Sequence, residues 1–78
     1  MVSVPPYVKY RREADGGLVY EHENYGYEDA TLLRVDGTVV DILEAVESGT
    51  TDRAVLEERF SPEAVTVLER RGFLATDD

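Results

Sequence analysis

Glu21-His22-Glu23 is the one place where a histidine and carboxylates meet in this chain. Such residues invite a metal-binding interpretation, because imidazole nitrogens and carboxylate oxygens are common metal ligands. Successive residues of a strand point to opposite faces, however, so an extended segment directs His22 away from both glutamates. We therefore interpret His22 as an ordinary histidine near the end of a strand.

The other candidates for chemistry also lack the neighbours that catalysis needs. Glu44, Glu47 and the pair Glu57-Glu58 fall on predicted helix surfaces, where they are read as solvated carboxylates. Gly16-Gly17 lacks the strand–GxGxxG–helix context of a phosphate-binding loop. The chain has no cysteine, which excludes disulfides and thiolate–metal sites. We expect a protein that is not an enzyme and that holds no cofactor and no metal.

The edges of the predicted sheet differ in a way that favours binding. The first strand, residues 7–12, follows Pro5-Pro6 and carries three basic side chains, and prolines and charges protect an edge against pairing. The third strand, Thr31-Leu32-Leu33-Arg34-Val35, has no proline and one charge. An unprotected edge can accept an extended peptide as an additional strand. The alternative is that a helix or loop of the same chain covers this edge.

The first third of the chain is predicted to form these strands. Residues 7–12 and 18–22 flank Asp15-Gly16, a dipeptide typical of a two-residue hairpin turn. Residues 23–29 are read as a loop whose tyrosines either contact a ligand or only hold the loop in place. In the third strand, Leu33 and Val35 are expected to face inward.

From residue 38 onward the apolar residues recur at helical spacing. Thr38 can cap a first helix, with Val39, Ile42, Leu43 and Val46 on one stripe, that ends at Gly49. Thr51 or Asp52 caps a short second helix, whose apolar residues are Val55, Leu56 and Phe60.

The segment Ser61-Pro62-Glu63 then opens a third helix, because a capping serine, a proline in the first turn and an acidic residue favour a helix start. Val65 and Leu68 supply its apolar stripe. Gly72 ends this helix, and Phe73 is expected to fold back onto the last turn. The order is therefore three strands followed by three helices, which predicts an α+β fold.

The length, the apolar content and the net charge of the chain limit the class of protein. A chain of 78 residues predicts a single domain, residues 1–78. No long apolar run and no signal-peptide pattern is present, so we expect a cytoplasmic protein without a membrane partner. The formal charge of −9 argues against nucleic acid, because phosphates must be neutralised by Lys and Arg. The acidic excess either attracts a basic partner or keeps the protein soluble.

Three segments resemble a known family. Arg11, Glu13, Gly16, Leu18 and Tyr20 form an R-x-E-x-x-G-x-L-x-Y pattern that resembles the small peptide chaperones of mycofactocin biosynthesis. The stretch LLRVDGTVVDILEAVESGT resembles the wider PqqD-like family of ribosomal-peptide recognition elements, which includes the chaperone of pyrroloquinoline quinone biosynthesis. LERRGFL, residues 68–74, is similar to the closing L-x-x-x-G-x-L of that family.

The resemblance implies a winged-helix-like fold of a three-stranded antiparallel sheet followed by three helices. It also implies a non-catalytic chaperone that binds the leader of a precursor peptide and presents it to a radical S-adenosylmethionine (SAM) maturase. In the family the leader adds as a strand beside the third strand, in a groove walled by the third helix. Carried onto this chain, the implied peptide-binding residues are Thr31, Leu32, Leu33, Arg34 and Val35 of the strand, and Ala64, Val67, Leu68 and Arg71 of the helix.

Two other classes of function remain open. The first is a winged-helix DNA-binding protein with residues 61–72 as its recognition helix, which would offer Arg70 and Arg71 against Glu63 and Glu69. The second is a structural subunit that dimerises by pairing the free edges of two copies. A monomer that awaits a peptide is the favoured state.

Overall fold

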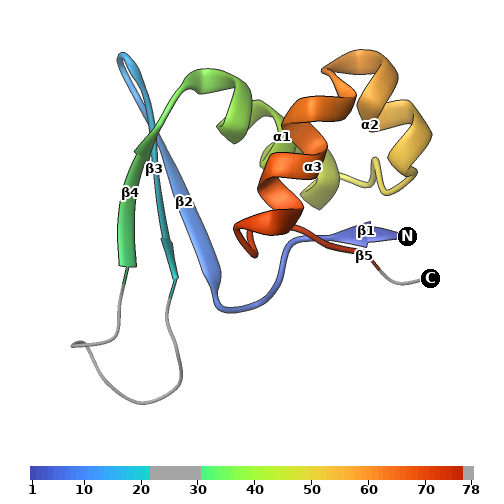
Figure 1. Cartoon of the computed structure of the whole chain (residues 1–78). Coiled ribbons are helices and arrows are strands. Elements are labelled where there is room, and N and C mark those ends of the chain that lie inside the picture. The colour runs from blue at the N-terminus through green and yellow to red at the C-terminus, as the bar shows by residue number, and fades with distance from the viewer. Residues whose placement is uncertain (22–30, 77–78) are drawn as a thin grey trace.

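The computed structural model describes residues 1–21 and 31–76. A three-stranded antiparallel sheet lies at one end, and three helices and a short two-stranded ribbon lie at the other (Figure 1). In chain order the elements are β1 (Val2–Ser3), β2 (Val8–Glu13), β3 (Gly16–Glu21), β4 (Thr31–Val35), α1 (Gly37–Glu47), α2 (Arg53–Arg59), α3 (Pro62–Arg70) and β5 (Ala75–Thr76). The predicted α+β fold, with three sheet strands followed by three helices, is confirmed.

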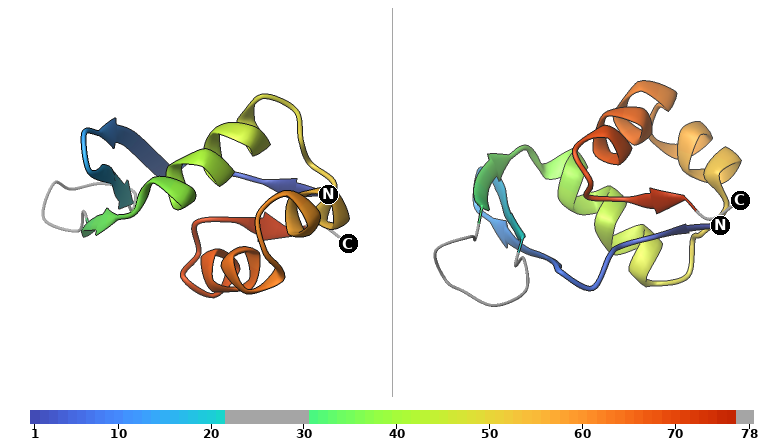
Figure 2. Two further views of the ribbon diagram at one scale, coloured as in Figure 1. Left: turned by 90° about the horizontal axis from the view of Figure 1, so that it is seen from above. Right: turned by 60° about the horizontal axis from the view of Figure 1, so that its bottom comes forward.

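Helix α1 joins the two halves of the molecule. It contacts β2 and β3 on one side and α3 on the other, so it lies between the sheet and the remaining helices (Figure 2). One apolar cluster runs through this junction, from Val19 of β3 through Ile42 and Leu43 of α1 to Val65 of α3 and Phe73. None of these five side chains is more than 2% exposed, so a single core holds the sheet against the helices.

The β2–β3 hairpin turns one residue earlier than the sequence predicts. Glu13 pairs with Gly16, so Ala14 and Asp15 form the turn instead of Asp15-Gly16. Gly16 has φ +147°, and a Cβ there would lie 2.4 Å from the main-chain oxygen of Val35. The glycine therefore opens β3 and lets β4 end close beside the turn.

The helix starts follow capping chemistry, with one correction. Asp36, and not Thr38, caps α1: its carboxylate accepts hydrogen bonds from the N–H groups of Thr38 and Val39. An aspartate satisfies the free N–H groups of a first turn as well as a threonine does, and here it stands directly at the strand–helix junction. Asp52 caps α2, and Ser61 caps α3 as expected.

The apolar pattern of the helices is confirmed except in α2. Val65 and Leu68 are buried, Gly72 follows α3 with φ +82°, and the N–H of Phe73 donates to the carbonyl of Leu68. Val55, however, is 41% exposed. The short α2 turns only one narrow face toward the core, and Leu56 occupies it.

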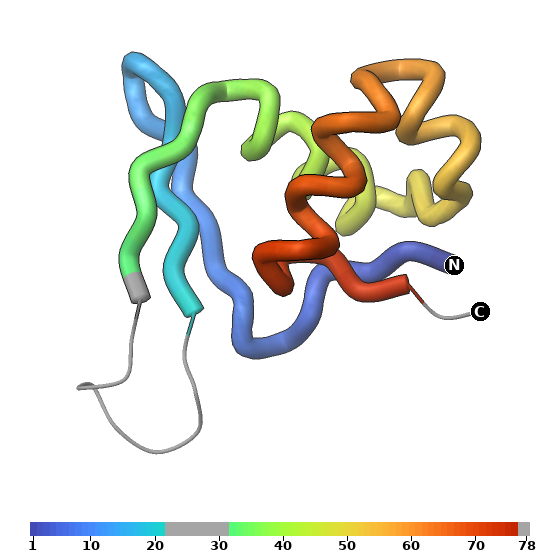
Figure 3. Tube along the Cα trace, in the orientation of Figure 1, coloured from blue at the N-terminus to red at the C-terminus, as the bar shows by residue number. Residues whose placement is uncertain are grey.

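The ribbon of β1 and β5 was not predicted from the sequence. Val2 pairs with Thr76, donates its N–H to the carbonyl of Thr51 and is fully buried. The two ends of the chain thus lie side by side under the helices (Figure 3). Two-residue strands carry no alternation that a sequence pattern could reveal.

Candidate functional site

Strand β4 forms one edge of the three-stranded sheet. The strand order is β2–β3–β4, and β4 pairs with β3 from Thr31 opposite Glu21 to Val35 opposite Gly17. Among residues 1–21 and 31–76, no strand pairs with the other side of β4. The edge strand that the sequence predicts to be unprotected is thus also unpaired on its outer side in this part of the chain.

The hairpin determines which main-chain groups of β4 face outward. In a two-residue hairpin the closing pair exchanges both main-chain hydrogen bonds, and bonded and non-bonded pairs then alternate along the ladder. Counting from that pair makes Val19 and Leu33 a hydrogen-bonded pair. The N–H and C=O groups of Leu32 and Arg34 therefore point away from β3, into the open edge. No described residue makes a hydrogen bond with them.

Helix α3 lies along the open edge of β4. In the view from above, β4 is the sheet strand on the side where α3 lies (Figure 2). Between them is a hollow of about 340 Å³, which we call the β4–α3 groove, lined by residues 33–36, Val39, Val67, Leu68 and Arg71. Its floor is apolar, because Leu33, Val35 and Val39 pack against the core and Leu68 is buried.

A second hollow continues the groove toward the start of α1. It has a volume of about 390 Å³ and shares Asp36, Val39, Val67 and Leu68 with the first. Its remaining walls come from the capping turn of α3 and from Thr38. The groove is therefore longer than β4 and reaches the first turns of both α1 and α3.

Six of the nine residues proposed for the site line the β4–α3 groove: Leu33, Arg34, Val35, Val67, Leu68 and Arg71. Ala64 lies in the adjoining hollow, where it packs against the core. Leu32 is 63% exposed and contributes its main chain to the open edge. Thr31 begins β4, and its side chain lies outside the described part of the structure.

Asp36 and Val39 also line the groove but are absent from the proposed set. The sequence shows Asp36 only as the end of a strand and Val39 only as part of an apolar stripe. Both residues lie at the junction of β4 and α1. Because this junction is short, the first turn of α1 must lie beside the end of β4, and this could have placed both residues in the site.

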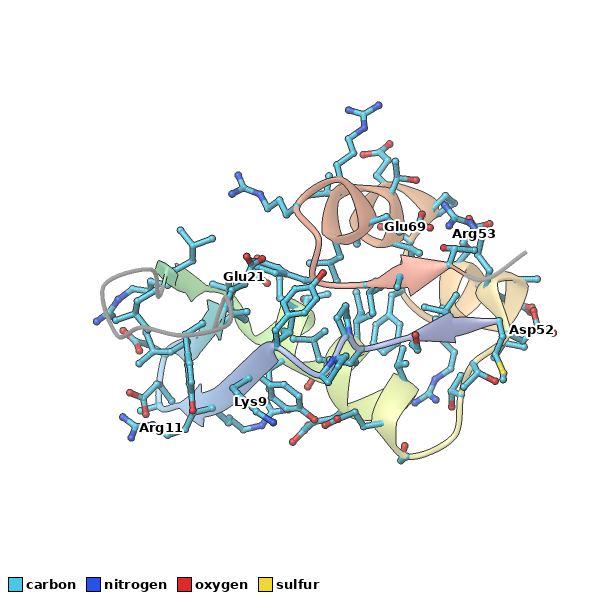
Figure 4. The ribbon with its side chains drawn as sticks, turned by 90° about the horizontal axis from the view of Figure 1, so that it is seen from below. Lys9, Arg11, Glu21, Asp52, Arg53 and Glu69 are labelled. Carbon is cyan, nitrogen blue, oxygen red and sulfur yellow. The ribbon has the colours of Figure 1, made fainter. Side chains whose placement is uncertain are left out.

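The tyrosine-bearing loop of residues 23–29 and His22 lie outside the described residues. Of the labelled side chains, Glu21 lies at the end of β3 beside the end of α3, and Lys9 and Arg11 lie on β2, the sheet edge farther from α3 (Figure 4). Basic side chains therefore do lie along the β2 edge, as the edge comparison expects.

A larger hollow, of about 620 Å³, lies by α1 and contains Tyr10. Its carboxylates already have partners. Arg12 donates to Asp41 and Glu44, and the hydroxyl of Tyr10 donates to Glu47. Burial, followed by the Glu47 carboxylate, raises the pKa of Tyr10 to about 12. This hollow adjoins β2, the other edge of the sheet, but that strand follows Pro5-Pro6 and carries three basic side chains. The β4–α3 groove, with its apolar floor beside an edge without such protection, is therefore the better candidate site.

Residues 1–21 and 31–76 contain no group of three or more His, Cys, Asp or Glu side chains that could hold a metal ion. Within the same residues every buried polar side-chain atom has a hydrogen-bond partner. None of the described helices combines the length and the apolar character needed to cross a bilayer.

Comparison with known proteins gives one match. The family model described as "Mycofactocin biosynthesis chaperone MftB-like" matches residues 2–76. The matched range includes both β4 and α3 and covers nearly the whole chain. No curated protein and no solved structure shows a significant match.

Proposed function

The chain belongs to the MftB-like family of mycofactocin biosynthesis chaperones, and from this premise we propose how it acts. It binds the leader of a ribosomally made precursor peptide as an additional strand beside β4, in the β4–α3 groove. It then presents the rest of that peptide to a radical SAM maturase and performs no catalysis itself. The observation that carries this proposal is the open edge of β4 above an apolar groove.

The open edge supplies the main-chain part of the affinity. Leu32 and Arg34 together offer two N–H donors and two C=O acceptors. Four hydrogen bonds at about 1 kcal/mol net each supply about half of the roughly −8 kcal/mol of a micromolar complex. Apolar side chains of the leader that enter the groove against Val39, Val67 and Leu68 supply the remainder.

The length of β4 supports presentation. A strand of five residues spans about 17 Å, so β4 can pair with only a short stretch of a leader. The remaining residues of the precursor stay outside the groove. A maturase can therefore reach the core of the peptide while the chaperone keeps its leader.

Titration of ¹⁵N-labelled protein with the precursor peptide tests the site. We expect amide shifts in residues 31–35 and 61–71. Shifts confined to residues 7–12, on the opposite edge, would contradict the proposal. Light scattering of the free protein at two concentrations tests the competing occupant, because edge-to-edge pairing of two copies would give a dimer whose fraction rises with concentration.

A pair of variants at one position separates the main chain from the side chain. Leu32→Pro removes an outward N–H and leaves the bonds to β3 in place, because proline is tolerated on an edge strand where its nitrogen faces outward. We expect it to weaken leader binding at least tenfold by calorimetry. Leu32→Ala keeps the N–H and is expected to bind within about threefold of the unmodified protein. Circular dichroism verifies that both variants fold. Equal losses in the two variants would mean that the strand template is not used.

A further inference from the structure

The arginines of this acidic chain differ in their partners, and Arg59, at the end of α2, lies over the ring of Phe60. Three are tied to carboxylates of the same chain: Arg11 to Glu13, Arg12 to Asp41 and Glu44, and Arg53 to Glu57 and Glu69. Arg34 makes one longer contact, 3.5 Å, with Asp15, and both side chains are 77% exposed. Within residues 1–21 and 31–76, Arg70 and Arg71 form no ion pair. These two cations are neighbours at the end of α3 in a chain of net charge −9.

Only one of these two arginines lines the groove. Arg71 lines the β4–α3 groove together with Leu33 and Val67. Arg70, one residue earlier on α3, lines a different hollow with Pro62 and Thr66; that hollow contains no residue of β4. The two side chains therefore have the same type and charge but different surroundings.

The two ends of the groove carry side chains of opposite charge. Helix α3 runs opposite to β4: Gly72 lies beside Glu21, which pairs with Thr31, whereas the start of α3 shares a hollow with Asp36. Arg71 therefore stands near the Thr31 end. Asp36 and Glu63 stand at the other end. Between the two ends the floor is apolar.

We propose that the groove selects a leader segment that carries an apolar side chain and, two positions away, an acidic side chain that pairs with Arg71. This inference rests on the proposed function. Alternate residues of an added strand face the groove and lie about 6.6 Å apart, so one can enter the apolar floor while the next reaches Arg71. The acidic residue lies toward the Thr31 end of β4.

The acidic excess of the whole chain does not prevent this contact. Exposed charges farther away than about 8 Å are largely screened at physiological ionic strength, so the local guanidinium dominates for a carboxylate that reaches it. A guanidinium can also bind a carboxylate through two parallel hydrogen bonds. An acidic side chain placed at the Asp36 end would instead lie beside the carboxylates of Asp36 and Glu63 and away from Arg71.

The matched variants Arg71→Glu and Arg70→Glu test the inference. Both make the same change in charge at the end of α3, so both carry a similar cost for the helix. Calorimetry with the precursor peptide should show at least a fivefold loss of affinity for Arg71→Glu and less than a twofold loss for Arg70→Glu. A series of precursor peptides, each with one Asp or Glu changed to Lys, identifies the acidic partner. One member should bind Arg71→Glu more tightly than it binds the unmodified protein.

The outcomes separate this inference from the function on which it rests. If the unmodified protein does not bind the precursor, the proposed function itself fails. If the precursor binds, but Arg71→Glu and Arg70→Glu weaken binding equally, the recognition of an acidic side chain by Arg71 is wrong and the strand template stands. The recognition of an acidic side chain by Arg71 is also wrong if no Lys-substituted peptide binds Arg71→Glu more tightly than it binds the unmodified protein.

Discussion

At the scale of single residues, Gly17 sets how closely the sheet meets the first helix. A Cβ at this position would lie 2.2 Å from Cγ2 of Val40, a fully buried side chain of α1, and 3.0 Å from the main-chain oxygen of Arg11. Neither neighbour can withdraw easily, since one belongs to the core and the other to the β2–β3 ladder. The absence of a side chain at Gly17 is therefore a packing requirement.

We accordingly expect Gly17→Ala to lower the free energy of unfolding by about 1–3 kcal/mol, the usual cost of overpacking. Gly37→Ala is the control, because nothing lies within 4 Å of a Cβ there and alanine favours a helix. Urea unfolding followed by circular dichroism measures both. Equal stability of the two variants would show that α1 does not pack closely on β3.

At the scale of elements, α2 and α3 are joined by a group of polar contacts at one end of the helices. Arg53 donates to Glu57 at 2.9 Å and also binds Glu69 and Thr66, and Thr76 donates to Glu69. Figure 4 shows Arg53 and Glu69 side by side. The hydrogen bond from Arg53, followed by that from Thr76, lowers the pKa of Glu69 below its usual range.

This lowered pKa gives a pH-dependent contribution to stability. A carboxyl group whose pKa is lower in the folded state stabilises the fold above the pKa of the unfolded chain, and that contribution disappears as the pH falls through the folded value. Glu69→Gln should therefore reduce the free energy of unfolding at pH 7 by about 0.5–1 kcal/mol, as for a partly exposed ion pair. Near pH 2 the variant and the unmodified protein should be equal. Glu58→Gln, at an exposed position on α2, should show no such difference. A loss for Glu69→Gln that is the same at both pH values would contradict the assignment.

The elements differ in how far the sequence predicts them. Strand β4 and helix α3 follow from local signals, namely a run of strand-forming residues and a Ser-Pro-Glu start, and both lie where expected. The hairpin turn was placed one residue too late, because Asp15-Gly16 is a strong turn signal and only the pairing of Glu13 with Gly16 overrides it. The β1–β5 ribbon depends on two chain ends that meet only after the helices have packed, and no local pattern encodes that meeting.

The candidate site was only partly predictable, because part of it depends on how distant elements pack and not on a local pattern. That β4 is an unprotected edge can be read from its composition, whereas the groove beside it depends on the position of α3. The outward direction of the Leu32 and Arg34 main chains required the hairpin register. The difference between Arg70 and Arg71 required coordinates, because two adjacent arginines look alike in a sequence.

At the scale of the whole molecule, one core supports the sheet and the helices together. A chain of this size buries only about 60% of the surface that it exposes when unfolded, so we expect its free energy of unfolding to be small. Among residues 1–21 and 31–76 nothing bonds to the outward main-chain groups of β4, so within this part of the chain they add no hydrogen bond to the fold. The fold therefore keeps β4 in place through Leu33 and Val35, which pack against the core, while the outward groups of Leu32 and Arg34 remain available.

The central claim is that these outward groups receive the leader, and amide hydrogen exchange at β4 tests it most directly. In the free protein, the amides of Leu33 and Val35 should exchange slowly because they bond to β3, whereas those of Leu32 and Arg34 should exchange rapidly. Saturation with the precursor peptide should slow exchange at Leu32 and Arg34 at least tenfold and change Leu33 and Val35 little. If Leu32 and Arg34 are already protected without the peptide, or remain unprotected when it is bound, β4 does not receive the leader.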